Sequence, residues 1–326
     1  MTRTLVVTGA SGFVGGALCR AALAAGYEVL ALGRRATVDP AHVGGAPYLP
    51  WDLAERTTPP HIPGQFIHPD AVVHCAGLAT DWARLEEFHH GNVVTTTTIL
   101  SAFPDTPRFV HLSTASVYDP RKPTVLATED EAETVVRHPD AYGRSKALAE
   151  DCVRRARPDA VILRPHAVYG PGDTTLLPRL LRAVRPTPRG PRLFAVGNGR
   201  QRLSLTSIDN LTAACLLAVT SSASGTFNIA DDEPVVLDAA LRQVLESRGI
   251  TAPPVYLPRA LALPLAGAAQ FLATSTRTFG LNRPPRLTMY AVRHLAYERT
   301  LDLTAARTRL GYRPGPTDIV TTLVPS

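Results

Sequence analysis

The feature that most constrains the fold is a glycine-rich turn directly after the first apolar run, residues 4–8. Gly9 permits a tight turn, Gly12 lets the backbone approach a pyrophosphate, and Gly15 allows close packing of a helix against a strand. The first turn of that helix offers unpaired N–H groups and the positive end of its dipole to an anion. We therefore predict a dinucleotide site that includes Gly9, Ser11, Gly12, Phe13, Val14 and Gly15.

Short apolar runs alternate with helical stretches through the first half of the chain, at residues 28–32, 71–75, 109–113 and 160–164. Continuous apolar strands separated by helices predict a parallel sheet that is covered on both faces. This is the α/β doubly wound Rossmann fold, in which ligands bind beyond the carboxyl ends of the strands.

The character of the chain changes after residue 170, where proline-rich stretches begin, although residues 226–229 still read as a strand of the main sheet. We therefore predict a dinucleotide-binding domain made of residues 1–170 plus about 206–230. A smaller, partly discontinuous substrate lobe would comprise residues 171–205 plus 231–326.

Composition argues against several other classes of protein. The formal net charge is +6, but the arginines are scattered and never alternate with aromatic residues, so we expect no nucleic-acid partner. The histidines and cysteines show no metal-ligand spacing. No apolar run reaches the ~20 residues of a membrane span, and no signal region opens the chain. We expect a cytoplasmic protein without a metal.

The second predicted strand ends in two arginines, Arg34 and Arg35. An NAD site would place a carboxylate near this point to bind the ribose hydroxyls. Arginines instead offer charge-assisted hydrogen bonds to a 2′-phosphate. We therefore predict NADP as the cofactor, with NAD less favoured.

Tyr142 and Lys146 are four residues apart on a predicted helix, and Lys146 is one of only two lysines in the chain. The spacing puts both on one helical face, about 6 Å apart along the axis. A compact ammonium can lie beside a phenol and a sugar hydroxyl, whereas a guanidinium cannot replace it there. The hydroxyls of Ser113, Thr114 and Ser116 follow another strand and emerge at the carboxyl edge of the sheet.

Together these segments resemble the extended short-chain dehydrogenase/reductase family. The resemblance covers residues 4 to about 230, through the glycine turn, residues 52–53, 74–77 and 92–93, the hydroxyl-rich stretch, the Tyr142 and Lys146 pair, and residues 164–173. It implies cofactor contacts from Asp52 and Leu53 at the adenine, from Cys75, Ala76 and Gly77 at the ribose and phosphates, and from Pro165, His166 and Val168 at the nicotinamide, with Asn92 also in the site.

The resemblance also implies a catalytic set of Thr114, Tyr142 and Lys146, with Ser113 and Ser116 as weaker candidates for the hydroxyl. Tyr142 would give a proton to a carbonyl oxygen while hydride arrives from NADPH. The Lys146 ammonium would lower the pKa of the Tyr142 phenol and bind the nicotinamide ribose. Thr114 would hold the carbonyl by a hydrogen bond.

Two readings of the substrate remain open within the family. Nucleotide-sugar epimerases and dehydratases carry a diphosphate-binding arginine where this chain has Leu203, although Arg200 or Arg202 could reach in from beside it. Residues 81–93, 284–288 and 300–314 resemble the 3β-hydroxysteroid dehydrogenase branch. That branch implies a ketone or secondary alcohol on a hydrophobic body such as a sterol, a terpenoid or a β-keto product.

We expect the apolar residues 261–272 to form a wall of the substrate pocket. A non-catalytic NADP-sensing protein is a third possibility, which the presence of both Tyr142 and Lys146 disfavours. The helices of residues 82–100 and 142–155 suggest a homodimer by analogy with the family.

Overall fold

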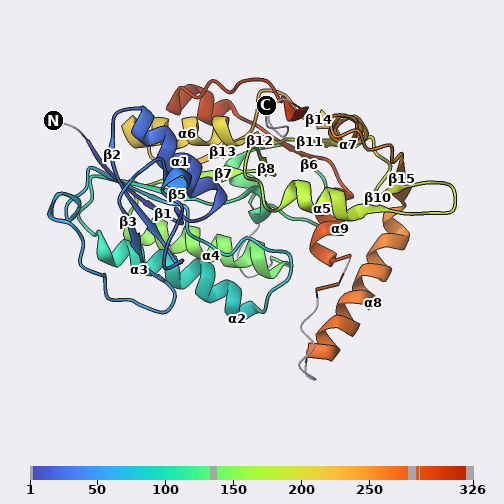
Figure 1. Ribbon diagram of the computed structural model, residues 1–326, viewed down its shortest axis with the longest axis horizontal. Coiled ribbons are helices and arrows are strands. Elements are labelled where there is room, and N and C mark those ends of the chain that lie inside the picture. The colour runs from blue at the N-terminus through green and yellow to red at the C-terminus, as the bar shows by residue number, and fades with distance from the viewer. Residues whose placement is uncertain (1–2, 133–137, 278–283, 286, 321–326) are drawn as a thin grey trace.

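The computed structural model describes residues 3–132, 138–277, 284–285 and 287–320 (Figure 1). Its centre is a seven-stranded sheet in the order β13-β7-β5-β4-β1-β2-β3, and every neighbouring pair is parallel. The strands are β1 (Thr4–Thr8), β2 (Glu28–Gly33), β3 (Tyr48–Pro50), β4 (Ala71–His74), β5 (Arg108–Leu112), β7 (Val161–Pro165) and β13 (Gly225–Ile229). The six strands expected from the sequence lie within one residue of their observed limits.

Helices cover both faces of this sheet, because successive apolar side chains of each strand point to opposite sides. Leu5 and Val7 of β1 pack with α1 (Phe13–Ala24) and α6 (Ile208–Thr220), whereas Val6 packs with α3 (Thr95–Ala102) and α4 (Ala141–Ala156). Figure 1 shows α1 and α6 on one side of the strands and α3 and α4 on the other. The predicted doubly wound Rossmann fold is confirmed.

The remaining elements form a smaller lobe beside the carboxyl ends of the strands. It contains α5 (Leu176–Ala183), α7 (Leu237–Glu246), α8 (Arg259–Arg277) and α9 (Met289–Leu295). Its short strands are β9 (Val184–Arg185), β10 (Arg192–Val196) and β15 (Pro254–Leu257) in one sheet, and β14 (Val235–Val236), β11 (Arg202–Leu203), β16 (Arg299–Leu301) and β6 (Thr124–Ala127) in another.

Two pairings tie this lobe to the Rossmann domain. The strand β6 comes from the first half of the chain and pairs with β16 near its end. The strand β8 (Val168–Tyr169), just after β7, pairs with β12 (Thr206–Ser207), just before α6. The first 170 residues therefore also contribute a strand to the smaller lobe, and the domain limits given above stay a prediction. Arg286, in one of the segments that resemble the 3β-hydroxysteroid dehydrogenase branch, lies outside the described residues.

Over the described ranges, no helix has both the length and the apolar character needed to cross a membrane. In the same part of the chain, no three His, Cys, Asp or Glu side chains lie together as a metal site requires.

Candidate active site

The glycine turn closes tightly between the ends of β1 and β4. Gly9 has a φ of +68°, and a Cβ atom there would lie 2.7 Å from the backbone nitrogen of Ala76. A Cβ on Gly15 would overlap the Gly9 carbonyl group, so the start of α1 lies directly against the turn. The N-terminus of α1 carries neither a side-chain cap nor an acidic residue in its first turn. These residues fit the pyrophosphate of a dinucleotide.

The adenosine side of the site lies at the end of β2. Arg34 and Arg35 are exposed, and neither guanidinium makes a hydrogen bond or ion pair within the described part of the chain. The Tyr48 hydroxyl of β3 donates to the Arg35 carbonyl oxygen at 2.7 Å. That hydroxyl and the Ser11 hydroxyl both lie against Gly33. Sequence reasoning missed Tyr48, because its position beside Arg35 follows only from the pairing of β2 with β3.

Hydrogen bonds with Thr8 and with Asn92 fix the loop after β4. The Ala76 N–H donates to the Thr8 hydroxyl at 3.1 Å. The Asn92 amide accepts from the Leu78 N–H at 2.8 Å and donates to the Leu78 carbonyl at 3.2 Å. It also donates to the Ser145 hydroxyl at 2.8 Å, which ties the loop to α4. Because Asn92 has both donors engaged, its direct contact with the cofactor stays a prediction.

The other predicted cofactor residues also lie at the carboxyl edge of the sheet. Asp52 and Leu53 follow β3, where an Asp52 carboxylate oxygen accepts from the Ala54 N–H at 3.0 Å and Leu53 is buried. Pro165 ends β7, residues 166–167 form the next loop, and Val168 begins β8. In that loop His166 pairs with the Ser204 carbonyl at 2.5 Å. The sheet therefore brings all the predicted cofactor segments to one edge.

Tyr142 and Lys146 lie one turn apart on α4, as their spacing predicts. The Lys146 ammonium donates to the Leu112 carbonyl at 2.6 Å and lies next to Gly77, 3.9 Å from the position of a Cβ atom there. Burial lowers the pKa of Lys146 to about 8, against the attraction of Glu150, which raises it. Lys146 thus lies beside the loop after β4.

The three candidate hydroxyls have different partners. Ser113 is buried and donates to the Glu150 carboxylate at 2.5 Å. Ser116 pairs with the Tyr290 hydroxyl at 2.8 Å. Thr114 is half-buried, its hydroxyl donates to the Ser116 hydroxyl at 3.2 Å, and it lowers the pKa of the nearby Tyr142 phenol. This distribution favours Thr114 as the hydroxyl that faces the substrate.

The pKa of Tyr142 differs from the expectation drawn from the sequence. Burial raises the pKa of the phenol, and hydrogen bonding to Thr114 and the charge of Arg179 offset the increase only in part. The Lys146 ammonium was expected to lower this pKa, but it is turned toward the Leu112 carbonyl and does not contribute. Tyr142 is therefore a protonated phenol at neutral pH, which suits a proton donor.

Gly143 explains how Tyr142 comes so close to the hydroxyls. A Cβ atom on Gly143 would overlap both the Ser116 carbonyl oxygen and the His138 ring. The absence of a side chain lets α4 lie against the single helical turn Ala115–Val117, which Thr114 caps through the Ser116 N–H. This role of Gly143 was not predicted, because a close approach between two elements is invisible in the sequence.

A cavity of about 520 Å³ opens beside Tyr142. Aromatic and apolar side chains line part of it, including Trp82, Phe88, Met289 and Tyr290. The size matches that of sites for small organic ligands. A hydrophobic body could therefore lie next to the Tyr142 hydroxyl.

Polar side chains line the rest of the cavity. Asp140, just before α4, binds the Arg293 guanidinium at 2.8 Å. Asp81 binds Arg179 at 3.2 Å. Arg84 is exposed and makes no ion pair within the described ranges. The cavity is thus mixed in character rather than purely apolar.

The expectation that residues 261–272 form an apolar wall of the pocket is wrong. Leu261, Leu265, Phe271 and Leu272 of α8 are between 56% and 72% exposed. The helix packs inward through small residues, since its alanines at 262 and 266 are fully buried against α9, and this turns the large side chains outward. Only Gln270 and Thr274 from this helix line the cavity.

The residues considered for a diphosphate lie away from the cavity. Leu203 is buried in a cluster of the smaller lobe with Tyr169. Arg200 and Arg202 are exposed, and neither lines the cavity.

Sequence comparison with known proteins identifies the family to which this chain belongs. Residues 5–230 match the NAD dependent epimerase/dehydratase family. A 2-alkyl-3-oxoalkanoate reductase from Stenotrophomonas maltophilia is 31% identical over 325 residues, which cover 95% of this chain and 94% of that protein. A 4-hydroxy-2-methyl-3-oxo-4-farnesyl-3,4-dihydroquinoline-1-oxide ketoreductase from Stigmatella aurantiaca is 33% identical over 315 residues, covering 94% and 90% respectively.

Two more distant relatives complete the comparison. The human decarboxylating sterol-4-alpha-carboxylate 3-dehydrogenase is 28% identical over 270 residues, which cover 77% of this chain and 68% of that protein. UDP-glucuronic acid 4-epimerase from Bacillus cereus, solved in complex with NAD, matches in fold with a TM-score of 0.70 at 20% identity over 98% of this chain and 96% of that one. The chain belongs to the NAD-dependent epimerase/dehydratase family, within the 3β-hydroxysteroid dehydrogenase-like branch of the extended short-chain dehydrogenases/reductases, and is an enzyme that uses a nicotinamide dinucleotide on a CH–OH group or a ketone.

Proposed function

We propose that this protein reduces a ketone on a hydrophobic small molecule to a secondary alcohol with NADPH. The observation that carries the proposal is the meeting of Thr114, Tyr142 and Lys146 at the edge of the sheet, beside the cavity. A proton donor, a second hydroxyl and a cation at one edge of a dinucleotide-binding sheet are the parts that carbonyl reduction requires.

The preference for NADP rests on the end of β2. Arg34 and Arg35 are exposed there, with the Tyr48 hydroxyl beside them. A 2′-phosphate would receive charge-assisted hydrogen bonds from the guanidinium groups, whereas the ribose hydroxyls of NAD would find no carboxylate.

The mechanism assigns one task to each catalytic side chain. The bound cofactor supplies the hydride that reaches the carbonyl carbon. Tyr142 gives its phenolic proton to the carbonyl oxygen, so that the C=O double bond becomes a C–H and an O–H bond. Thr114 donates a hydrogen bond to the same oxygen and orients the carbonyl. The Lys146 ammonium, beside the loop after β4, would bind the nicotinamide ribose, and solvent returns the proton to the Tyr142 phenolate.

The substrate class follows from the cavity and from the relatives. The cavity combines aromatic side chains with the charged groups of Asp81, Arg84 and Arg293. The reductases from Stenotrophomonas maltophilia and Stigmatella aurantiaca, both above 30% identity, are named for a 3-oxoalkanoate and for a farnesylated quinoline ketone. Both substrates combine an apolar chain with a polar group near the ketone. We expect the same combination here.

Nucleotide-sugar epimerisation is the alternative within the same fold. The segment in which epimerases carry the diphosphate-binding arginine supplies no such group here, because Leu203 is buried elsewhere and Arg200 and Arg202 do not line the cavity. The cations that line it, Arg84 and Arg293, come from other segments. The fold likeness to the epimerase is at 20% identity and does not favour its chemistry.

The test mixes the purified protein and NADPH with cyclic ketones, β-keto acids and nucleotide sugars. Loss of nicotinamide absorbance with a ketone or β-keto acid supports the proposal. Interconversion of a nucleotide sugar without net NADPH loss would contradict it in favour of an epimerase. Binding of NADPH without turnover of any compound would contradict it in favour of a sensor.

A further inference from the structure

A second tyrosine, Tyr290, lies at the catalytic centre and comes from α9 of the smaller lobe. Its ring meets the Tyr142 ring edge-on, with the centroids 5.9 Å apart and an interplanar angle of 76°. Both rings line the cavity. Tyr290 is 148 positions from Tyr142 in the sequence, and no motif in the chain singles it out.

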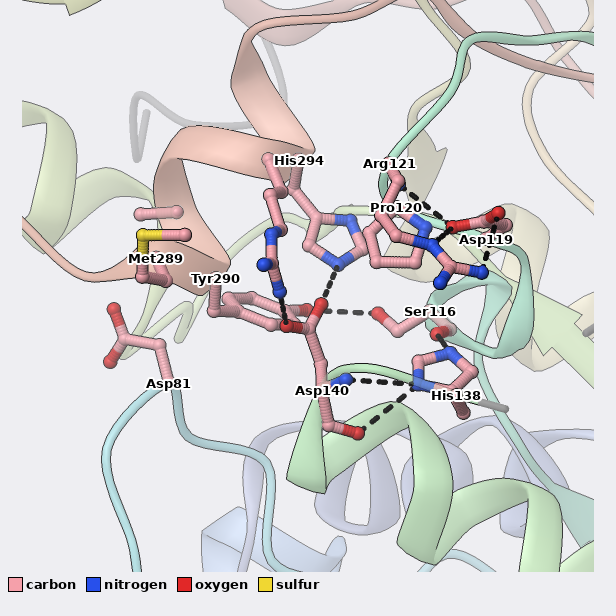
Figure 2. Close-up of polar contacts among 12 residues, drawn as sticks. Asp81, Ser116, Asp119, Pro120, Arg121, His138, Asp140, Met289, Tyr290 and His294 are labelled. Carbon is pink, nitrogen blue, oxygen red and sulfur yellow. Dashed lines mark hydrogen bonds and ion pairs between the residues drawn. The ribbon is translucent and has the colours of Figure 1, made fainter. Parts of the chain in front are cut away.

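The Tyr290 hydroxyl ends a row of three hydroxyl groups. It is 2.8 Å from the Ser116 hydroxyl oxygen, and either atom can donate (Figure 2). The Thr114 hydroxyl in turn donates to the Ser116 hydroxyl at 3.2 Å, and Thr114 is near enough to Tyr142 to lower the pKa of its phenol. The row therefore runs from Tyr290 through Ser116 to Thr114, the threonine proposed to bind the substrate carbonyl.

The surroundings hold Tyr290 and Ser116 in place. The His294 ring, one turn along α9, lies 4.1 Å from the Tyr290 ring between centroids. His138 pairs with the Ser116 carbonyl at 2.8 Å, as Figure 2 shows. The ion pair between Arg293 and Asp140 joins α9 to the residue that precedes α4. The helix that carries Tyr290 is thus anchored to the helix that carries Tyr142.

When a ketone binds, the Thr114 hydroxyl must donate its hydrogen bond to a different acceptor. Its single hydrogen, which goes to Ser116 in this structure, must turn toward the carbonyl oxygen of the substrate. The Ser116 hydroxyl can then donate its own hydrogen to Thr114, provided that this hydrogen is not given to Tyr290. When Tyr290 is the donor of that pair, the Ser116 hydrogen is free for Thr114, and hydrogen bonds aligned in this way strengthen one another.

We propose that Tyr290 is a positioning residue that acts through Ser116 to direct the Thr114 hydroxyl toward the substrate carbonyl. The inference rests on the proposed ketone reduction and extends it to a residue of the smaller lobe. Burial raises the pKa of Tyr290, so its phenol keeps the hydrogen at working pH. The packing of α9 against the Rossmann domain would thereby set the orientation of the Thr114 hydroxyl.

Tyr290→Phe keeps the ring and removes only the hydroxyl. We expect kcat for ketone reduction to fall by up to about tenfold, the equivalent of one directed hydrogen bond, while the Kd for NADPH stays within about twofold. Ser116→Ala should cause a similar loss, and the double variant should be no worse than either single one. Tyr27→Phe, at the opposite edge of the sheet, serves as a matched control and should leave kcat unchanged.

The decisive comparison introduces Tyr290→Phe into a protein that already carries Thr114→Ala. If Tyr290 acts through Thr114, adding Tyr290→Phe to Thr114→Ala causes no further loss of kcat. If the two losses multiply, Tyr290 has an independent role and the proposal is overturned. Equal kcat for Tyr290→Phe and the wild type would overturn it as well.

A second readout does not depend on turnover. In protein labelled with 13C at the tyrosine ζ carbons, Thr114→Ala should shift the resonances of both Tyr142 and Tyr290. A shift of Tyr142 alone would break the row of hydroxyls and overturn the inference. If the wild type reduced no ketone, the proposed function would fail, and these resonances would still decide whether the three hydroxyls form one chain.

Discussion

Replacing Lys146 by Met should make the protein more stable while removing its activity. Lys146 is 5% exposed, and its ammonium has the Leu112 carbonyl as its hydrogen-bond acceptor. Met has a similar length and no charge, so the substitution removes the buried cation without leaving a large cavity.

The size of the effect follows from the pKa of the ammonium. Burial lowers the pKa of Lys146 from 10.5 to about 8. At about 1.36 kcal/mol per pKa unit, the buried charge costs about 3 kcal/mol at neutral pH. Loss of the hydrogen bond to Leu112 offsets about 1 kcal/mol. The net expectation is a gain of about 2 kcal/mol in the free energy of unfolding.

The gain should depend on pH in a defined direction. Below pH 8 the lysine is protonated in both the folded and the unfolded wild type, so the full cost is present. Between pH 8 and 10.5 the unfolded state binds the proton more tightly, so the wild type becomes more stable as pH rises. The advantage of the variant should therefore shrink over this window.

Urea unfolding at pH 7 and pH 10, followed by circular dichroism, measures both differences. Lys122→Met, at the other lysine and in an exposed position, is the matched control and should change stability by less than about 0.5 kcal/mol. A Lys146→Met variant that is less stable than the wild type at pH 7, or a difference that does not vary with pH, would refute the reasoning.

The other predictions concern the arginines at the end of β2, the close contact at Gly143 of α4, and the buried Ser113. Replacing Arg34 and Arg35 by Ala should raise the KM for NADPH at least about tenfold in initial-rate assays and leave the KM for NADH nearly unchanged. The reason is that the guanidinium groups would bind the 2′-phosphate, which NADH lacks. Equal losses for both cofactors would contradict this. Gly143→Ala should lower the free energy of unfolding by about 1–3 kcal/mol, since its Cβ would meet backbone, and should also slow turnover. Gly64→Ala, where a Cβ would meet nothing within 4 Å, should do neither in thermal melts. Ser113→Ala should cost about 1 kcal/mol of stability through its lost bond to a buried carboxylate, while kcat stays within about twofold; a large loss of kcat would point to Ser113 as the catalytic hydroxyl.

The sheet could be predicted because its strands are buried on both faces. Residues 71–74 and 161–165 have no exposed side chain, and each strand begins with three consecutive apolar residues, which made both strands recognisable in the sequence. The site followed from the same fact, because parallel strands deliver the loops after them to one edge. The joint position of Tyr142 and Lys146 needed only the period of a helix.

The remaining parts of the site depend on contacts between distant segments. Tyr290 meets Ser116 across 174 positions, and only the docking of α9 brings them together. The orientation of α8 was misjudged because its inward face uses alanines, which left the larger residues such as Phe271 to solvent. The pKa of Tyr142 was misjudged because burial, which raises it, cannot be read from the spacing to Lys146.

The central claim is that Tyr142 donates the proton in an NADPH-dependent ketone reduction. The most direct measurement compares the wild type with Tyr142→Phe, with the loss of NADPH absorbance followed in the presence of the best ketone from the panel. We expect kcat to fall by about a hundredfold or more, while the Kd for NADPH, read from nicotinamide fluorescence, changes by less than about twofold. A Tyr142→Phe variant that reduces the ketone at the rate of the wild type would contradict the account.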